Sequence, residues 1–357
     1  MAGQSPVLLI IDRDFSLSHL RGCRRVYVNM CPIWRHIPLL RALKNFRINV
    51  QFVRDNPIKT FNRGLGCESS SMIRVGTASW SDPEFVRDWY PAKMPSGERL
   101  SWYGEHFDLV EVNSTFYGIP AQTLIQRWCD QTPEGFTFDV KLHKLLSRHA
   151  AKMDSLPPVL RKQASAKGEN IILTPEIEAA VAKTFREAVE PMAEQGKLGR
   201  FLLQLSPAFG PRSHQLQDLE HLISILSPQM AVELRNRNWL VGEQKTDTVA
   251  FFSKHNVPLV MVDAPADEHF TILPKFQEVT SSSLAYLRLH GRNAKAYLTG
   301  KTVATRFDYN YSDEELKEVY QDVERLAAQA KDVHVIFNNN RSNYAPKAAE
   351  RFKALLR

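Results

Sequence analysis

From Met72 onward the sequence repeats one unit: a short apolar or β-branched run, a polar loop, and an amphipathic helix. This alternation is typical of a parallel sheet whose strands are connected by helices. The apolar runs that we predict to be strands are 73–78, 109–115, 137–142, 201–205, 231–234, 258–262, 284–289 and 333–337.

Helical patterns lie between most of these runs. Thr174 is placed to cap one helix, and Ser312 with Glu315 forms a capping box at the start of another. The stretch 266–283 has weak helical signal, and we expect an irregular link there. The predicted helices are 121–130, 175–194, 215–226, 248–255, 313–330 and 346–356.

Eight strands that alternate with helices over residues 72–357 predict a single (β/α)₈ barrel of the TIM type, an α/β fold for which roughly 250 residues is typical. A doubly wound open sheet is the alternative. It is less favoured because no glycine-rich phosphate-binding loop follows any of the strands, and for the same reason we expect no nucleotide cofactor.

Residues 1–71 differ in composition from the rest. They hold eleven Lys and Arg against four Asp and Glu, which accounts for the whole net charge of +7, and they end in a flexible Gly/Ser-rich stretch. Apart from possible strands at 7–11 and 48–53, this segment has no sustained pattern. We predict a basic, poorly structured extension or a mis-assigned start ahead of Met72. The alternative is a basic arm that binds nucleic acid or another partner.

The cysteines and apolar runs limit the class of protein. The four cysteines form no Cys-x-x-Cys pair, which argues against a disulfide scaffold or a zinc ribbon. The early apolar run 7–11 is too short for a signal sequence, and no run approaches the length of a membrane span. These features predict a cytoplasmic protein with no membrane partner.

Several motifs occur in an order that resembles one family. They are Gly76-Thr77-Ala78-Ser79-Trp80, Trp89-Tyr90-Pro91, Val110 to Tyr117, Gln204 to Phe209, Val232-Glu233-Leu234-Arg235, His290-Gly291-Arg292 and Phe337-Asn338-Asn339. The chain is similar over 72–357 to the YecE-like family, also called domain of unknown function 72. The resemblance implies a TIM-type barrel loosely related to sugar-isomerase-like barrels, with no established activity. The family's usual Thr-His pair is here Ser147-Arg148-His149, and Ser206 replaces a common proline, so His149 is not among the predicted site residues.

Polar residues at alternate positions mark the ends of several predicted strands. Alternate residues of a strand share a face, so Glu111, Asn113 and Thr115 are expected to point together, as are Arg288 and His290. In (β/α)₈ barrels the functional groups sit at the C-terminal strand ends. One interpretation is therefore a polar active-site cup. The other is an internal ion-pair network, in which Glu111, Asp139, Glu233 and Asp263 balance Lys141, Arg235, Arg288 and Arg292.

We favour the cup and predict an acid/base enzyme of the isomerase or hydrolase type. Its four cations favour a small, polar substrate that is anionic, phosphorylated or sugar-like. Glu111 and Glu233 are the predicted acid/base residues, with His143 and His290 as proton shuttles. The predicted substrate-binding residues are Asn113, Thr115, Tyr117, Lys141, Gln204, Arg235, Trp239, Asp263, Arg288, Arg292, Asn338 and Asn339.

Three alternatives stay open. A divalent metal held by His143, Glu233, Asp263 and His290 is less favoured, because every acid has a cation that competes for it. A nucleic-acid-binding or processing barrel would use the basic arm as a tether and tyrosines as stacking surfaces. A non-catalytic scaffold would use the charges only to brace the fold. Tyr297, Tyr309 and Tyr311 lie in the long segment after the seventh strand, which is a candidate lid.

Overall fold

The computed structural model describes residues 71–357. The basic extension and the two strands predicted within residues 1–70 lie outside the described residues. Among residues 71–357, no helix combines the length and apolar composition needed to cross a bilayer.

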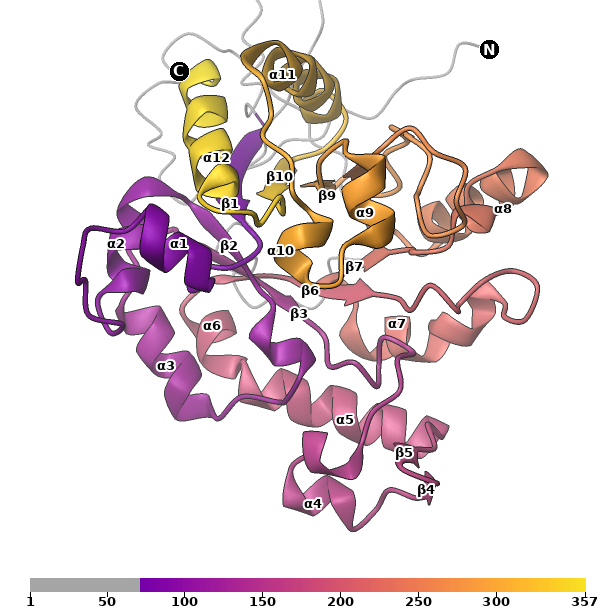
Figure 1. Cartoon of the computed structure of the whole chain (residues 1–357). Coiled ribbons are helices and arrows are strands. Elements are labelled where there is room, and N and C mark those ends of the chain that lie inside the picture. The colour runs from indigo at the N-terminus through magenta and orange to yellow at the C-terminus, as the bar shows by residue number, and fades with distance from the viewer. Residues whose placement is uncertain (1–70) are drawn as a thin grey trace, which may run out of the picture. The chain divides into compact units, whose positions relative to one another are not determined.

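Eight parallel strands form the centre of the fold (Figure 1). Their order in the sheet is β7-β6-β3-β2-β1-β10-β9-β8. The two ends of this sheet meet, because Val232 of β7 donates to Pro258 O at 2.9 Å and accepts from Val260 N at 2.8 Å. The predicted (β/α)₈ barrel is thus confirmed. The strands are β1 (Met72–Thr77), β2 (Leu109–Val112), β3 (Thr137–Lys141), β6 (Leu198–Gln204), β7 (Met230–Glu233), β8 (Met261–Asp263), β9 (Leu284–Leu289) and β10 (Asp332–Phe337).

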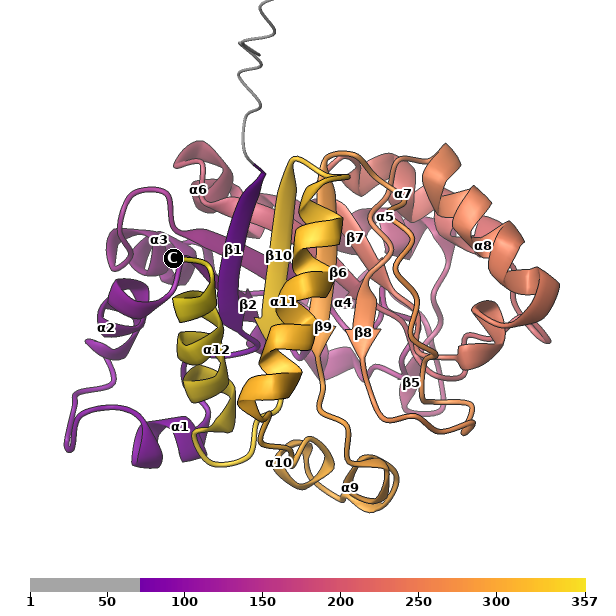
Figure 2. The same ribbon diagram turned by 90° about the horizontal axis from the view of Figure 1, so that it is seen from above.

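Helices cover the outside of the barrel, and α11 and α12 pack against β10 and β1 (Figure 2). The caps predicted at Thr174 and Ser312 are present. The main outer helices are α1 (Pro83–Asp88), α2 (Arg99–His106), α3 (Gln122–Asp130), α5 (Pro175–Ala188), α6 (Glu190–Glu194), α7 (Glu220–Leu226), α8 (Gly242–Lys254), α11 (Asp313–Ala327) and α12 (Tyr344–Leu355). Residues 264–283 contain no helix, as expected from their weak pattern.

Some connections between the strands contain elements that the sequence pattern did not predict. The link between β1 and β2 holds α1 and α2, where no helix was expected. The link after β3 holds α4 (Pro158–Arg161) and a small hairpin, β4 (Ala166–Lys167) with β5 (Asn170–Ile171). The segment after β9 is not an open loop but holds α9 (Ala294–Thr299) and α10 (Val303–Arg306). Both short helices lie beyond the C-terminal ends of β9 and β10 (Figure 2). This end of the barrel is the side where polar strand-end residues were predicted.

The second strand is shorter than predicted. It ends at Val112, and Ser114–Phe116 forms a single 3₁₀ turn. The prediction that Glu111, Asn113 and Thr115 share one strand face was therefore wrong. Thr115 explains the turn, because its hydroxyl lies 2.9 Å from Val112 O and 2.7 Å from Lys141 O and can donate its one hydrogen to either. A side chain that bonds backbone carbonyls in this way competes with the extended ladder.

Candidate active site at the barrel mouth

A buried ion-pair network crosses the barrel interior. Arg288 of β9 donates from Nε and Nη2 to Glu111 of β2 at 2.9 and 2.7 Å. Its Nη1 also donates to Glu233 of β7. Glu111 and Glu233 are 0% exposed and Arg288 is 1% exposed. These three strands are not neighbours in the sheet, so one guanidinium links separate strands across the barrel interior.

The network fixes the ionisation of its members. Burial alone would raise the pKa of Glu233, but the charge of Arg288 and the contact with His290 outweigh burial and hold that pKa well below 4.5. Burial also opposes the charge of Arg288, yet Glu111 and Glu233 together raise its pKa. Both carboxylates of the network are satisfied by partners, since Tyr286 also donates to Glu111 Oε2 at 3.1 Å.

His290 and two amides lie next to Glu233. The ring Nε2 of His290 is 3.6 Å from Glu233 Oε1, and its Nδ1 is 2.7 Å from Asn338 Nδ2. Gln204 Nε2 donates to Glu233 Oε1 at 3.0 Å. Burial lowers the pKa of His290 to about 4, despite the opposing effect of Glu233. His290 is therefore a neutral imidazole near pH 7.

Two further cations reach the network from the mouth and are only partly buried. Arg235 Nη1 is 3.6 Å from Glu233 Oε1, and its Nη2 donates to Tyr297 at 3.2 Å. Lys141 ends β3 with its ammonium over the Phe116 ring, 4.6 Å from the centroid. Within residues 71–357, no hydrogen bond and no carboxylate within 4.0 Å reaches Lys141 Nζ. The cup thus holds three cations against two carboxylates.

Three residues that sequence reasoning did not include in the site also belong to this interior. Tyr286 bonds Glu111, and His334 Nδ1 is 2.7 Å from Asp139 Oδ2, where Asp139 is the residue of β3 that pairs in register with Glu111. Tyr286 lies two residues before Arg288, and His334 four before Asn338. The two-residue alternation of the strands is therefore the signal that places both side chains on the inner face.

His149 is the third such residue. Its ring packs edge-on against Phe116, with centroids 5.2 Å apart. Burial, together with the charges of Lys141 and Arg235, lowers the pKa of His149 to about 4. His149 therefore stands at the mouth as a neutral imidazole, although its sequence context departs from the family motif.

Asp263 and Arg292 form a separate cluster. Arg292 Nε contacts both oxygens of Asp263 at 3.1 Å, and its Nη1 donates to Glu318 at 2.8 Å. Tyr311 donates to Asp263 at 2.8 Å and is itself buried. The Arg292 guanidinium, which the sequence predicts to bind substrate, is therefore paired with carboxylates of the chain itself. Tyr297 and Tyr311 are both buried, so these two rings offer no stacking surface for a nucleic acid, whereas Tyr309 is only partly buried.

The remaining predicted site residues lie apart from the network or have structural partners. Asn113 and Asn339 bond the backbone oxygens of Ala78 and Tyr309. His143 is fully buried, and burial lowers its pKa to about 4. Tyr117 is 66% exposed. Thr115 contacts two carbonyls, as described above.

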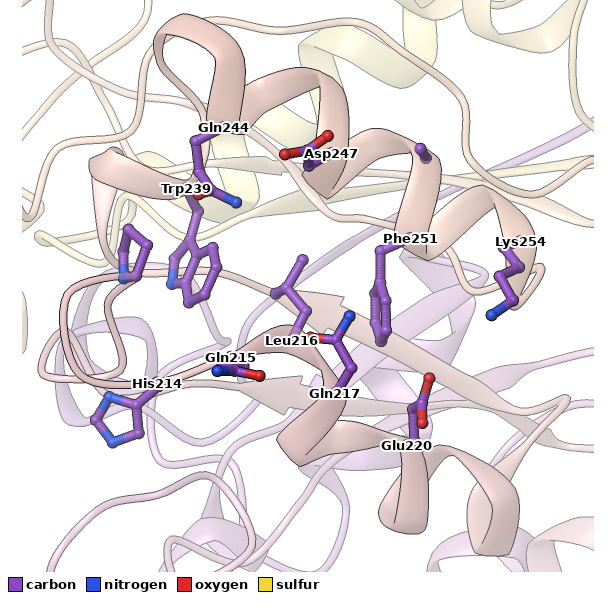
Figure 3. Close-up of a pocket in the computed structure, with 12 residues that line it drawn as sticks. His214, Gln215, Leu216, Gln217, Glu220, Trp239, Gln244, Asp247, Phe251 and Lys254 are labelled. Atoms are coloured by element: carbon purple, nitrogen blue, oxygen red, sulfur yellow. The ribbon is translucent and has the colours of Figure 1, made fainter.

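Trp239 is buried, and its ring nitrogen donates to Phe209 O at 2.8 Å. It forms part of the wall of a cleft of about 500 Å³ between the segment 211–220 and helix α8 (Figure 3). Of the predicted site residues, Trp239 alone contributes to this wall, and the Glu111–Arg288–Glu233 network does not reach it. The cleft is thus a separate feature of the barrel's outer layer.

The four side chains of the alternative metal site, His143, Glu233, Asp263 and His290, do not converge. Glu233 and His290 are neighbours, but Asp263 is bound by Arg292 and Tyr311, and His143 contacts the backbone of Leu145. Within residues 71–357, no three His, Cys, Asp or Glu side chains converge as metal ligands would.

The family predicted from the motifs is confirmed by comparison with known proteins. The family model described as "Protein of unknown function DUF72" matches residues 74–357. The UPF0759 protein YunF of Bacillus subtilis is 26% identical over 292 residues, which cover 80% of this chain and 95% of YunF.

Two crystal structures of DUF72 family proteins are similar. That from Enterococcus faecalis has 27% identity and a TM-score of 0.60, covering 80% of this chain and 98% of its own. That from Thermotoga maritima has 26% identity and a TM-score of 0.64, covering 80% and 99%. The chain therefore belongs to the DUF72 family and shares its barrel fold.

Proposed function

We propose that the chain is an acid/base enzyme, of the isomerase or hydrolase type, that acts on a small polar substrate with a phosphate or carboxylate group. One observation carries this proposal. Arg288 satisfies Glu111 and Glu233, which leaves Lys141 and Arg235 as partly exposed cations at the mouth. Cations in that position favour an anionic ligand group, and Arg235 has the planar fork suited to it.

His290 and Glu233 are the proposed acid/base pair. The neutral ring of His290 can accept a proton, and the carboxylate of Glu233, 3.6 Å away, would stabilise the imidazolium that results. Glu111 has a positioning role in this account, because both of its oxygens hold Arg288. Gln204 and Asn338 orient Glu233 and His290 through the hydrogen bonds described above.

The pairing of Arg288 with Glu111 and Glu233 also favours a second candidate, a non-catalytic barrel in which the network only stabilises the fold. Buried ion pairs can be structural, and removing one partner is costly whether or not a ligand binds. The two candidates differ in what Lys141 and Arg235 do. In a scaffold these two partly exposed cations have no ligand, and replacing them changes no binding.

A thermal-shift screen of the full chain separates these candidates. The ligands are glucose 6-phosphate, fructose 6-phosphate and hydroxycarboxylates, with glucose and fructose as uncharged controls. A ligand at 100 times its Kd adds about 2.7 kcal/mol, which raises Tm by a few degrees. We expect stabilisation by an anionic ligand that is lost in Arg235→Met and Lys141→Met and kept in Lys317→Met, an exposed lysine on α11. No stabilisation, or stabilisation unchanged in both cup variants, would overturn the proposal.

A further inference from the structure

Lys141 occupies an unusual environment for a lysine. It ends β3 at the barrel mouth, close enough to Glu111 and Glu233 for their charges to act on it, yet Arg288 pairs with both of those carboxylates. The Phe116 ring lies under its ammonium, 4.6 Å from the centroid. A lysine that serves only the fold is normally ion-paired or extended into solvent. Within residues 71–357, Lys141 Nζ has no carboxylate partner, and its side chain is not extended into solvent.

The charges around Lys141 come from four elements. Glu111 of β2 and Glu233 of β7 favour its charged form, whereas Arg288 of β9 and Arg235 after β7 oppose it. Burial and the nearby arginine charges outweigh the effect of the two glutamates, and they lower the pKa of Lys141 from 10.5 to about 8. At pH 7.5 about a quarter of such lysines are uncharged, against roughly one in a thousand at the ordinary value. Desolvation beside other cations is a known way of activating an amine as a nucleophile.

We propose that Lys141 Nζ forms a covalent imine with the carbonyl carbon of an anionic aldehyde or ketone bound at the mouth. This inference rests on the proposed function, because the same cup must bind the substrate's anionic group. Arg235, which also contacts Glu233 and Tyr297, is the second cation at the mouth and would bind that group. The substrate class is therefore narrowed to carbonyl compounds that carry phosphate or carboxylate.

Imine formation moves protons from the lysine nitrogen to the carbonyl oxygen, and groups at the mouth can carry them. The Nζ lone pair attacks the carbonyl carbon, and the carbonyl oxygen takes a proton to give a carbinolamine. The remaining N–H proton is then transferred to the hydroxyl, which leaves as water as the C–N bond becomes the double bond of the imine. A neutral imidazole is needed to carry the proton from the amine to the oxygen. His149, which packs on Phe116 beside Lys141, provides one.

Trapping with borohydride tests this inference on the full chain. The probe is substoichiometric pyridoxal 5′-phosphate, an aldehyde that carries a phosphate, followed by sodium borohydride and peptide mapping. Borohydride reduces an imine to a stable secondary amine. We expect Lys141 to be labelled at least about tenfold faster than Lys144, a half-buried lysine three residues away. Added inorganic phosphate should slow labelling at Lys141 only.

Two variants complete the test. Lys141→Arg keeps the positive charge and removes the nucleophile, so it should retain stabilisation by anionic ligands and lose the label. Lys141→Met should lose both. Label spread evenly over the lysines, or no label on Lys141 while anionic ligands stabilise the chain, would overturn the imine and leave the proposed function intact. Selective label on Lys141 without stabilisation by any anion of the screen would instead overturn the proposed function.

Discussion

Arg288 and Glu111 form a bidentate pair in which two parallel hydrogen bonds, of 2.9 and 2.7 Å, join side chains of two separate strands, β9 and β2, across the barrel interior. Because Arg288 also holds Glu233, one buried guanidinium sets the positions of both carboxylates. The polar interior is therefore rigid, and the groups that can contact a ligand are those at the barrel mouth.

Glu111→Gln should strongly destabilise the fold. It removes one charge from a fully buried network and leaves Arg288 under-compensated, which typically costs about 3–5 kcal/mol. The matched control is Glu268→Gln, whose side chain is 96% exposed and 3.9 Å from Arg237. An exposed pair of this kind contributes about 0–1 kcal/mol. Urea unfolding measures both variants, and equal effects would contradict a network that depends on burial.

Gly76→Ala should disrupt the contact between β1 and β2. A Cβ at Gly76 would lie 1.8 Å from Leu109 O, inside the backbone of the next strand. Gly97 provides the control, because a Cβ there meets nothing within 4 Å. We expect Gly76→Ala to lower the free energy of unfolding by at least about 3 kcal/mol, while Gly97→Ala stays within about 1 kcal/mol. A well-folded Gly76→Ala protein with unchanged stability would show that the strands approach less closely.

Thr115→Val should affect stability and leave binding unchanged. The variant keeps the shape of the side chain but removes a hydroxyl that reaches two buried carbonyls at 2.9 and 2.7 Å. Losing this hydrogen bond should cost about 1–3 kcal/mol. The stabilisation gained from an anionic ligand should be the same as in the parent chain. Loss of that gain, at intact stability, would restore the substrate-binding role expected from the sequence.

The stability should fall as the pH is lowered from about 6.5 to about 4. The folded-state pKa of His290 is depressed to about 4 from 6.5, so over this range the unfolded chain binds more protons than the folded one. His143 and His149 are depressed to about 4 as well and act in the same direction. Below pH 4.5 the depressed pKa of Glu233 adds a further loss.

Urea unfolding between pH 7.5 and 4.5 checks this dependence. His290→Asn removes one of the titrating groups, so its stability should fall less steeply with pH. The difference should be on the order of 2–3 kcal/mol across the range, since one pKa unit corresponds to 1.36 kcal/mol. Parallel curves for the two proteins would mean that His290 is protonated in the folded state near pH 6.

The sequence predicts the barrel well because each strand is a distinct apolar run between loop signals. It also identifies the acids and bases of the network, since a carboxylate such as Glu111 within an apolar run requires a buried partner. It does not predict which partner each acid takes. Glu233 is paired by Arg288 from β9, whereas Asp263, at the end of a neighbouring strand, is paired by Arg292. Those choices depend on side-chain reach across the closed barrel.

Other features could not be predicted for local reasons. The alternation that continues past Val112 predicts Thr115 on a strand face, but its hydroxyl favours the 3₁₀ turn. Trp239 follows a strand end and still packs on Phe209 in the outer layer. The neighbours of His149 differ from the family motif and so do not indicate a site residue, although its ring lies near Lys141. In each case tertiary contacts outweigh the local pattern.

The most direct test of the account is a crystal structure of the full chain with glucose 6-phosphate or another anion that stabilises it. We predict the anionic group at the barrel mouth, within hydrogen-bond distance of Lys141 Nζ and the Arg235 guanidinium, with the Glu111–Arg288–Glu233 network unchanged. An anion bound elsewhere, for example in the cleft beside Trp239, with an empty mouth would contradict the account.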